Sequence, residues 1–181
     1  PTFSLLFLPG MIFGLIIAPV FAKRFDSKSV FIGARVFGII VDVIFFFAGF
    51  ENIPLVMFLY ALTSIPLGIS SVVSATMLTN TIEYAEWKFG NRQEGLISST
   101  QSLTAKIGMA LSAGVIGAVL EIADYVPNHV TSETQMMMHG AFTLFCAFIG
   151  VLAIIPMLFN KFTDKEHQRI MNELAERKSQ K

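Results

Sequence analysis

Residues 95–120 read GLISSTQSLTAKIGMALSAGVIGAVL, an apolar stretch that carries one charged side chain, Lys106. A stretch of this length is long enough to cross the hydrocarbon core of a bilayer as a single α-helix. An ammonium group at the centre of such a helix is costly unless it borders water or a carboxylate. The stretch therefore predicts a membrane helix whose centre faces a polar pathway, as in proteins that move polar solutes across membranes.

Four more segments have the length and apolar character of a bilayer crossing. With the first, they cover residues 2–22, 30–50, 53–82, 95–120 and 136–159. The chain is 54% hydrophobic and 14% charged, whereas soluble domains are about a quarter charged. We therefore predict an all-α membrane protein with five transmembrane helices in a bundle over residues 1–160, and a cytoplasmic tail over residues 161–181.

The basic residues predict the orientation of these helices. Apart from Arg35 and Lys106, every lysine and arginine follows the first, third or fifth apolar segment, and residues 51–52 and 121–135 contain none. Because basic connections stay on the cytoplasmic side, we expect an integral protein of the plasma (inner) membrane with a cytoplasmic carboxyl terminus. The odd number of spans, and a start inside an apolar segment, favour the carboxyl-terminal part of a larger transporter.

Several function classes are excluded. The net charge is zero, so the chain lacks the basic surface that nucleic acid requires. The single cysteine, Cys146, rules out a disulfide framework and a thiolate metal site. His129, His139 and His167 are too far apart in sequence for a metal site, and no phosphate-binding loop or catalytic triad is present. We expect no enzyme activity, no catalytic residue, no metal and no cofactor.

Polar side chains gather in the halves of two segments that adjoin one basic connection. Gln101 and Ser102 precede Lys106, and Ser74 lies in a hydroxyl-rich part of residues 53–82. Together these residues predict a shared aqueous cavity in which a substrate binds. The alternative is that the hydroxyls bond to carbonyls of their own helices, which is common.

The second segment carries two charges of its own, Arg35 and Asp42. Arg35 is close enough to the basic end to extend its head group to the membrane surface. Counted at about 1.5 Å per residue, Asp42 lies roughly 18 Å deep and Lys106 roughly 16 Å deep. An intramembrane pair between Asp42 and Lys106 is therefore compatible with depth. The alternative partner of Lys106 is a carboxylate on a part of the protein outside this chain.

The loop before residue 95 has a distinctive composition. Residues 83–95 read EYAEWKFGNRQEG. This string resembles the one that joins helices ten and eleven in the glycoside–pentoside–hexuronide cation symporters, the relatives of melibiose permease in the major facilitator superfamily. A lysine follows inside helix eleven of that family, and Arg92 and Lys106 keep this arrangement. Glu83 stands where many members have aspartate, which preserves the negative charge.

The resemblance implies that the five segments correspond to helices 8–12 of a twelve-helix major facilitator fold. It implies cation-coupled symport, with Na⁺ or H⁺, of a sugar or glycoside by alternating access. Lys106 would face the central cavity, and Glu83 and Arg92 would form a cytoplasmic gate. The coupling cation would be bound by the missing amino-terminal half, which is a partner of this chain together with the substrate and membrane lipid.

Other readings of the whole chain stay open, among them a lysolipid or other solute carrier of the same superfamily, and a channel or structural membrane subunit.

Two local features of the sequence predict how helices pack and begin. Gly10 and Gly14 form a Gly-x-x-x-Gly pair of the kind that packs helices closely. Residues 163–166 have the spacing of a helix capping box, and Ile170 and Leu174 form a thin apolar stripe. They predict a short solvated helix in the tail, or alternatively one that docks on a partner.

Overall fold

The protein is all-helical in the computed structural model, which describes residues 2–127 and 129–179. Six helices occur in these residues, and they are α1 (Thr2–Ala22), α2 (Ser27–Ala48), α3 (Ile53–Phe89), α4 (Glu94–Ile122), α5 (Ser132–Phe159) and α6 (Asp164–Ser179). Four of them, α2 to α5, are long and apolar enough to cross a membrane, and Phe7–Ala22 of α1 forms a shorter apolar helix. Each predicted membrane segment therefore corresponds to one helix.

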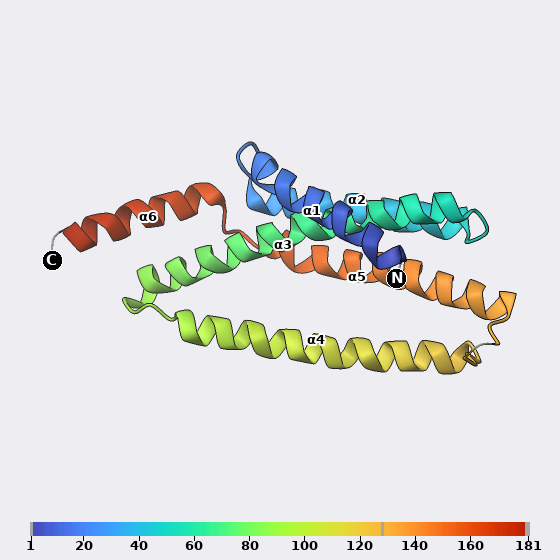
Figure 1. Cartoon of the computed structure of the whole chain (residues 1–181). Coiled ribbons are helices and arrows are strands. Elements are labelled where there is room, and N and C mark those ends of the chain that lie inside the picture. The colour runs from blue at the N-terminus through green and yellow to red at the C-terminus, as the bar shows by residue number, and fades with distance from the viewer. Residues whose placement is uncertain (1, 128, 180–181) are drawn as a thin grey trace.

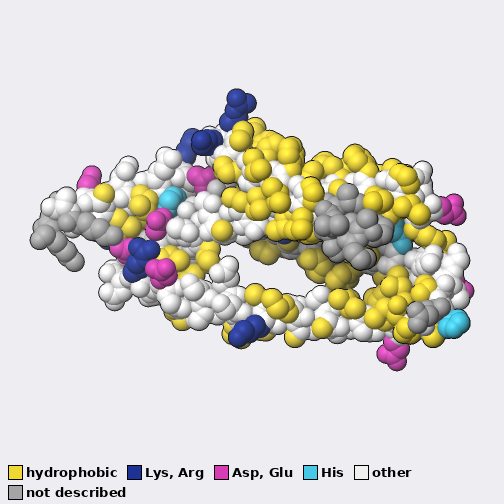
Figure 2. All heavy atoms as spheres, in the orientation of Figure 1, with side chains coloured by type: hydrophobic (Ala, Val, Ile, Leu, Met, Phe, Trp, Pro, Cys, Tyr) yellow, Lys and Arg dark blue, Asp and Glu magenta, His cyan; other side chains and the backbone are white. Residues whose placement is uncertain are grey.

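The helices α1, α2, α3 and α5 lie side by side, whereas α4 runs along one side of this group and α6 projects from one end (Figure 1). The α1–α2 and α3–α4 connections lie at the end that carries α6. We call this the basic end, because Lys23, Arg24, Lys88 and Arg92 lie there. The opposite end shows no lysine or arginine in the space-filling view (Figure 2). The five long helices thus alternate in direction, as the distribution of basic residues predicts.

The backbones of α1 and α3 come close together where the two helices cross. A Cβ atom added to Gly14 would lie 2.3 Å from the Ile65 carbonyl oxygen, and one added to Gly68 would lie 2.3 Å from the Met11 carbonyl oxygen. Gly10 is equally crowded by Ser64. These backbones can touch only because no side chain separates them. The packing role predicted for Gly10 and Gly14 is confirmed.

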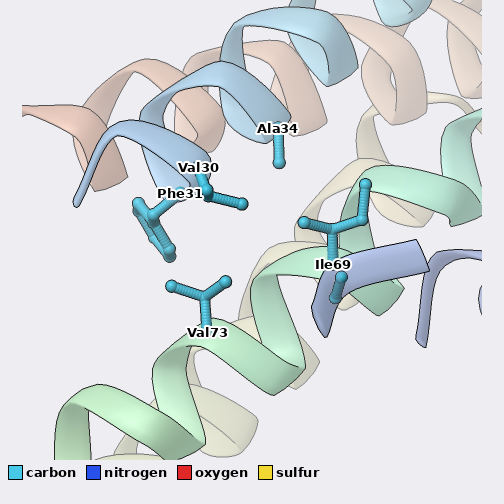
Figure 3. Packing of buried hydrophobic residues seen from close by; sticks show 6 residues of the cluster. Val30, Phe31, Ala34, Ile69 and Val73 are labelled. Atoms are coloured by element: carbon cyan, nitrogen blue, oxygen red, sulfur yellow. The ribbon is translucent and has the colours of Figure 1, made fainter. Parts of the chain in front are cut away.

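Apolar side chains of α1, α2 and α3 form a small core beside this crossing, nearer the basic end. Its members are Ala18, Val30, Phe31, Ala34, Ile69 and Val73. Figure 3 shows Val30 and Phe31 of α2 directed toward Val73 of α3. On the other side of α2, Gly150 of α5 lies close to Ile39, and the His139 ring nitrogen Nε2 is 3.1 Å from the Phe45 carbonyl oxygen. These contacts hold α2 between α3 and α5.

The predicted end of the third segment is wrong. The sequence places it at residue 82 and starts a loop at Glu83, but α3 continues to Phe89 and ends at Gly90, whose φ of 75° is left-handed. A helix that leaves the hydrocarbon core loses its apolar character without losing its backbone hydrogen bonds. Only a residue such as glycine, which adopts positive φ at little cost, ends it there.

The helix α4 differs from the others because none of its residues is buried. It is attached mainly through its two ends. At the far end, the Thr134 hydroxyl of α5 donates a hydrogen bond of 3.1 Å to the Ala123 carbonyl oxygen, and Asp124 turns the chain with a φ of 46°. Figure 2 shows an opening between the middle of α4 and the other helices. The middle of α4 therefore has no helical neighbour among the residues that the structure describes.

The tail helix α6 packs on the end of α3, although the sequence favoured a solvated helix. Ile170 is 3% exposed and Leu174 is 7% exposed, so the apolar stripe is covered. The first turn of α6 is held to the start of α2 by hydrogen bonds in which each segment caps the other. The Ser27 amide donates to Asp164 Oδ2 at 2.8 Å, and the Asp164 amide donates to Asp26 Oδ1 at 2.8 Å. Each carboxylate satisfies amide groups at a helix start that would otherwise lack partners.

Candidate functional site

Lys106 lies on the exposed surface of α4, near the middle of the helix. No ion pair joins Lys106 to Asp42 among the residues that the structure describes. At 3.6 residues per turn, Lys106 lies about 120° around α4 from Ser112, which faces the other helices. The ammonium group thus projects away from the helices of this chain, and the Asp42–Lys106 pair stays a prediction.

Gln101, Ser102 and Ser74, the other predicted cavity residues, are also exposed. Their hydroxyl-bearing neighbours bond to their own helices, since Thr100 donates to the Leu96 carbonyl oxygen at 2.9 Å and Thr76 donates to Val72 at 3.1 Å. The polar halves of α3 and α4 diverge from their common loop, as Figure 1 shows. This chain alone does not bring these residues together, and the shared cavity stays a prediction.

A cleft of about 450 Å³ lies between α4 and the group formed by α1, α2, α3 and α5. Its walls are mainly aliphatic and aromatic. Its polar side chains include those of Arg35 and Asp42 on α2, and Ser112 on α4. Lys106, Gln101, Ser102 and Ser74 do not line it. From the sequence, Asp42 is expected to lie deep in the membrane and Arg35 to reach the membrane surface, whereas the structure places both beside one cleft with the Arg35 Nε atom buried.

Asp42 is 9% exposed, and within the described part of the chain its carboxylate has no hydrogen bond and no ion pair. Arg35 precedes it by about two helical turns. The guanidinium of Arg35 lies 5.3 Å from the centre of the Phe31 ring, and its Nε atom is buried without a hydrogen-bond partner. Buried charges are normally paired or hydrogen-bonded. The cleft therefore holds two charged groups whose polar needs the described residues do not meet.

The two predicted gate residues, Glu83 and Arg92, both lie at the basic end, but each contacts a different partner. Glu83 contacts the His167 ring of α6, and Arg92 Nε lies 3.0 Å from Glu94 Oε2 on an exposed surface. Among the described residues, no ion pair joins Glu83 to Arg92. Glu83 of α3 thus contacts the tail helix, which its position in the sequence does not predict.

The contact between α3 and α6 extends beyond Glu83. The Trp87 indole Nε1 donates a hydrogen bond of 2.7 Å to Glu173 Oε2, and Arg169 Nε lies 3.0 Å from Glu173 Oε1. The bond from Trp87 first, and then the contact with Arg169, hold the pKa of Glu173 below its ordinary value. A tryptophan in a polar loop beside an amphipathic tail is the sequence signal that could have indicated this docking.

The chain is similar to known proteins along most of its length. The family model described as MFS/sugar transport protein matches residues 1–164. The raffinose carrier protein of Pediococcus pentosaceus is 31% identical over 182 residues, covering 96% of this chain and 28% of that protein. The glucuronide carrier protein homolog of Escherichia coli is 29% identical, covering 94% of this chain and 38% of that protein.

The isoprimeverose transporter of Lactiplantibacillus pentosus is 27% identical, covering 92% of this chain and 35% of that protein. The chain therefore spans about a third of the length of these curated relatives. The family match covers α1 to α5 and the loop between α3 and α4.

Proposed function

Because the chain belongs to the MFS/sugar transport protein family, we propose that it forms part of a transporter that carries a sugar or glycoside by alternating access, driven by a Na⁺ or H⁺ gradient. The resemblance to the glycoside–pentoside–hexuronide symporters is confirmed by the family match and by the raffinose, glucuronide and isoprimeverose carriers. The chain is thus an all-helical portion of a membrane transport protein and not of an enzyme.

The observation that carries the proposal is the position of Lys106. It lies in an apolar helix that directly follows the family's loop, and it projects away from the helices of this chain. A charge at mid-membrane needs water or a polar partner. A central cavity between two transporter halves would supply both, because substrate sites of secondary transporters lie near the midplane between the repeats.

We assign substrate recognition on this side of the cavity to Lys106, Gln101, Ser102 and Ser74. Sugars present many hydroxyl groups, and an ammonium, an amide and hydroxyls are suitable donors and acceptors for them. Lys106 would bind either a sugar hydroxyl or a carboxylate of the other half. The coupling cation would bind in that other half; within the described residues, no group of three or more His, Cys, Asp or Glu side chains is placed to hold a metal ion.

The gate proposal concerns the basic end, which we assign to the cytoplasmic side of the inner membrane. Glu83 and Arg92 would pair with residues of the other half when the cytoplasmic side is closed. Because Glu83 contacts His167 and Arg92 contacts Glu94 here, closure would exchange these contacts for new ones. Such an exchange costs little at an exposed ion pair such as Arg92–Glu94.

The test is uptake of labelled raffinose, a β-glucuronide and isoprimeverose by cells that express the full-length protein. We expect saturable uptake of at least one of these sugars that stops when the Na⁺ and H⁺ gradients are collapsed. Lys106→Ala should lower uptake about 10- to 150-fold, the loss of one charge-assisted hydrogen bond. Membrane insertion should be unchanged. Leu103→Ala, on the same helix, is the matched control.

Unaltered uptake by Lys106→Ala would show that the lysine has no part in transport. Flux that does not saturate and that persists without ion gradients would instead indicate a channel. Uptake of lysophospholipid with no competition by sugars would indicate a lysolipid carrier.

A further inference from the structure

A second pocket, of about 310 Å³, lies at the basic end, where the start of α2, the last turns of α3 and residues 160–166 meet. We propose that it binds the head group of a zwitterionic phospholipid with a primary ammonium group, namely phosphatidylethanolamine. The proposal is separate from the transport function, because none of the predicted cavity or gate residues lines this pocket. It depends on a buried amide, on charges of both signs and on an adjacent apolar surface.

The first observation is the side chain of Asn80 on α3. It is 7% exposed and lines the pocket, and its amide makes no hydrogen bond to the described residues. An amide has two N–H donors and a carbonyl acceptor, and leaving them without partners in a buried position is costly. The Thr81 hydroxyl, in the same wall, does have a partner, since it donates a 2.8 Å bond to the Met77 carbonyl oxygen. Asn80 is thus a polar group available to a ligand in this pocket.

The second observation is that charges of opposite sign line the pocket without pairing with each other. The walls carry two ammonium groups and two carboxylates, those of Lys28, Lys161, Asp164 and Glu166. Within the part of the chain that the structure describes, no ion pair joins any two of them. A purely anionic ligand would be repelled by the carboxylates, and a purely cationic ligand by the lysines. A ligand that carries one phosphate and one ammonium group matches both.

Two of these charges are held in place by the fold. Lys28 Nζ donates to two carbonyl oxygens at and just beyond the end of α5, at 2.7 and 3.2 Å, so one of its three N–H donors remains. Asp164 Oδ2 accepts from the amide and the hydroxyl of Ser27. Lys161 and Glu166 are exposed and can close on a ligand. The lysines and the buried amide therefore suit the phosphate, and the carboxylates suit the ammonium group.

The third observation identifies the source of the head group as a membrane lipid. The pocket borders the end of α5, where exposed apolar side chains stop and polar ones begin. Leu158 and Phe159 are 60% and 80% exposed, and the next two residues, Asn160 and Lys161, line the pocket. Tyr84, also in the wall, is a residue type enriched at membrane–water interfaces. This border lies at the level of lipid head groups, so the attached acyl chains would cover Leu158 and Phe159.

The test uses the purified full-length protein in dodecylmaltoside micelles and native mass spectrometry, which counts the lipids bound to each protein molecule. Phosphatidylethanolamine is titrated alongside phosphatidylcholine and phosphatidylglycerol with the same acyl chains. We expect phosphatidylethanolamine to bind about tenfold more tightly than either, the effect of one hydrogen bond to a charged group. Choline has no N–H donor for the carboxylates, and glycerol brings no positive charge. Glycerophosphoethanolamine, which has the same head group without acyl chains, should not compete at equal concentration.

Two substitutions of exposed residues locate the site without disturbing the fold. We expect Lys161→Ala to weaken phosphatidylethanolamine binding about fivefold, the effect of about 1 kcal/mol from one lysine near a lipid surface. Lys165→Ala, which makes the same charge change outside the pocket, should leave binding unchanged. Glu166→Gln should reduce the preference for phosphatidylethanolamine over phosphatidylcholine, whereas Glu176→Gln, on the same helix and outside the pocket, should not.

Equal affinity for the three lipids, or equal effects of Lys161→Ala and Lys165→Ala, would overturn the proposal. Competition by glycerophosphoethanolamine at equal concentration would also overturn it, because the pocket would then take a soluble phosphate ester and not a lipid. None of these measurements involves uptake. The lipid site can therefore fail while the transport function stands, and the transport function can fail while the lipid site stands.

Discussion

Replacing Gly68 by alanine should force α1 and α3 apart. The new Cβ would lie 2.3 Å from the Met11 carbonyl oxygen and 3.1 Å from the Gly14 Cα, whereas ordinary contacts begin near 3.4 Å. The obstructing atoms belong to a helix backbone, which cannot rotate away as a side chain can. The two helices must therefore separate by about 1 Å along their contact, and packing around the crossing is lost.

The size of the effect follows from two opposing terms. Overpacking a tight contact costs about 1–3 kcal/mol, and we take the upper value because the obstruction is rigid. Alanine recovers about 1 kcal/mol through its better helix propensity. The net loss in free energy of unfolding is thus about 2 kcal/mol, which lowers the folded-to-unfolded ratio about 30-fold.

The assay is equilibrium unfolding of the purified full-length protein in mixed micelles of dodecylmaltoside and increasing SDS. The matched control is Gly33→Ala on α2, where an added Cβ meets nothing within 4 Å. This control should be neutral or more stable by up to about 1 kcal/mol. If Gly68→Ala unfolds at the same SDS fraction as Gly33→Ala, the close α1–α3 crossing is refuted.

Three further predictions concern the basic end. Because the pKa of Glu173 is lowered in the folded state, the contribution of its bond with Trp87 is complete above the ordinary value of 4.5 and is lost as pH falls through the folded pKa. The protection factors of the amides in residues 164–179, taken relative to the intrinsic exchange rate at each pH, should therefore fall at acid pH, and Glu173→Gln should remove this dependence. Ile170→Asp should release α6 to proteolysis, whereas Met171→Asp on its exposed side should not; equal digestion of both variants would contradict the docking. Arg92→Ala should shift the transporter toward inward-facing states, seen as faster labelling of cysteines placed in the cytoplasmic cavity, and unchanged labelling would remove Arg92 from the gate.

Much of the helical architecture could be predicted from sequence because a membrane protein satisfies its backbone hydrogen bonds within each segment. Apolar runs long enough to cross a bilayer become helices whatever their neighbours are. The close packing at Gly10 and Gly14 was predictable for a similar reason, since a Gly-x-x-x-Gly pair removes side chains from one helix face. The Thr163 hydroxyl also caps α6, accepting a 3.4 Å bond from the Glu166 amide as the local pattern predicted.

Predictions failed where the outcome depended on contacts between distant segments. Nothing local shows that Trp87 bonds to Glu173 some 86 residues later. The end of α3 is different, because Gly90 is a local signal that a boundary drawn from hydrophobicity alone overlooks. The depth of Asp42 could be counted from the sequence, but its surroundings could not. Whether a charge at a given depth meets another charge depends on the rotation and neighbours of its helix.

The sequence by itself determined that this protein is a set of membrane helices of alternating direction, with a basic end and a lysine at mid-depth. These properties depend on segment length, hydrophobicity and charge position, which are local. Only the tertiary structure decided that α6 covers the end of α3, that α4 has no buried residue, and that Asp42 and Arg35 border one cleft. These properties arise from packing, in which each helix face acquires its environment from residues far away in the chain.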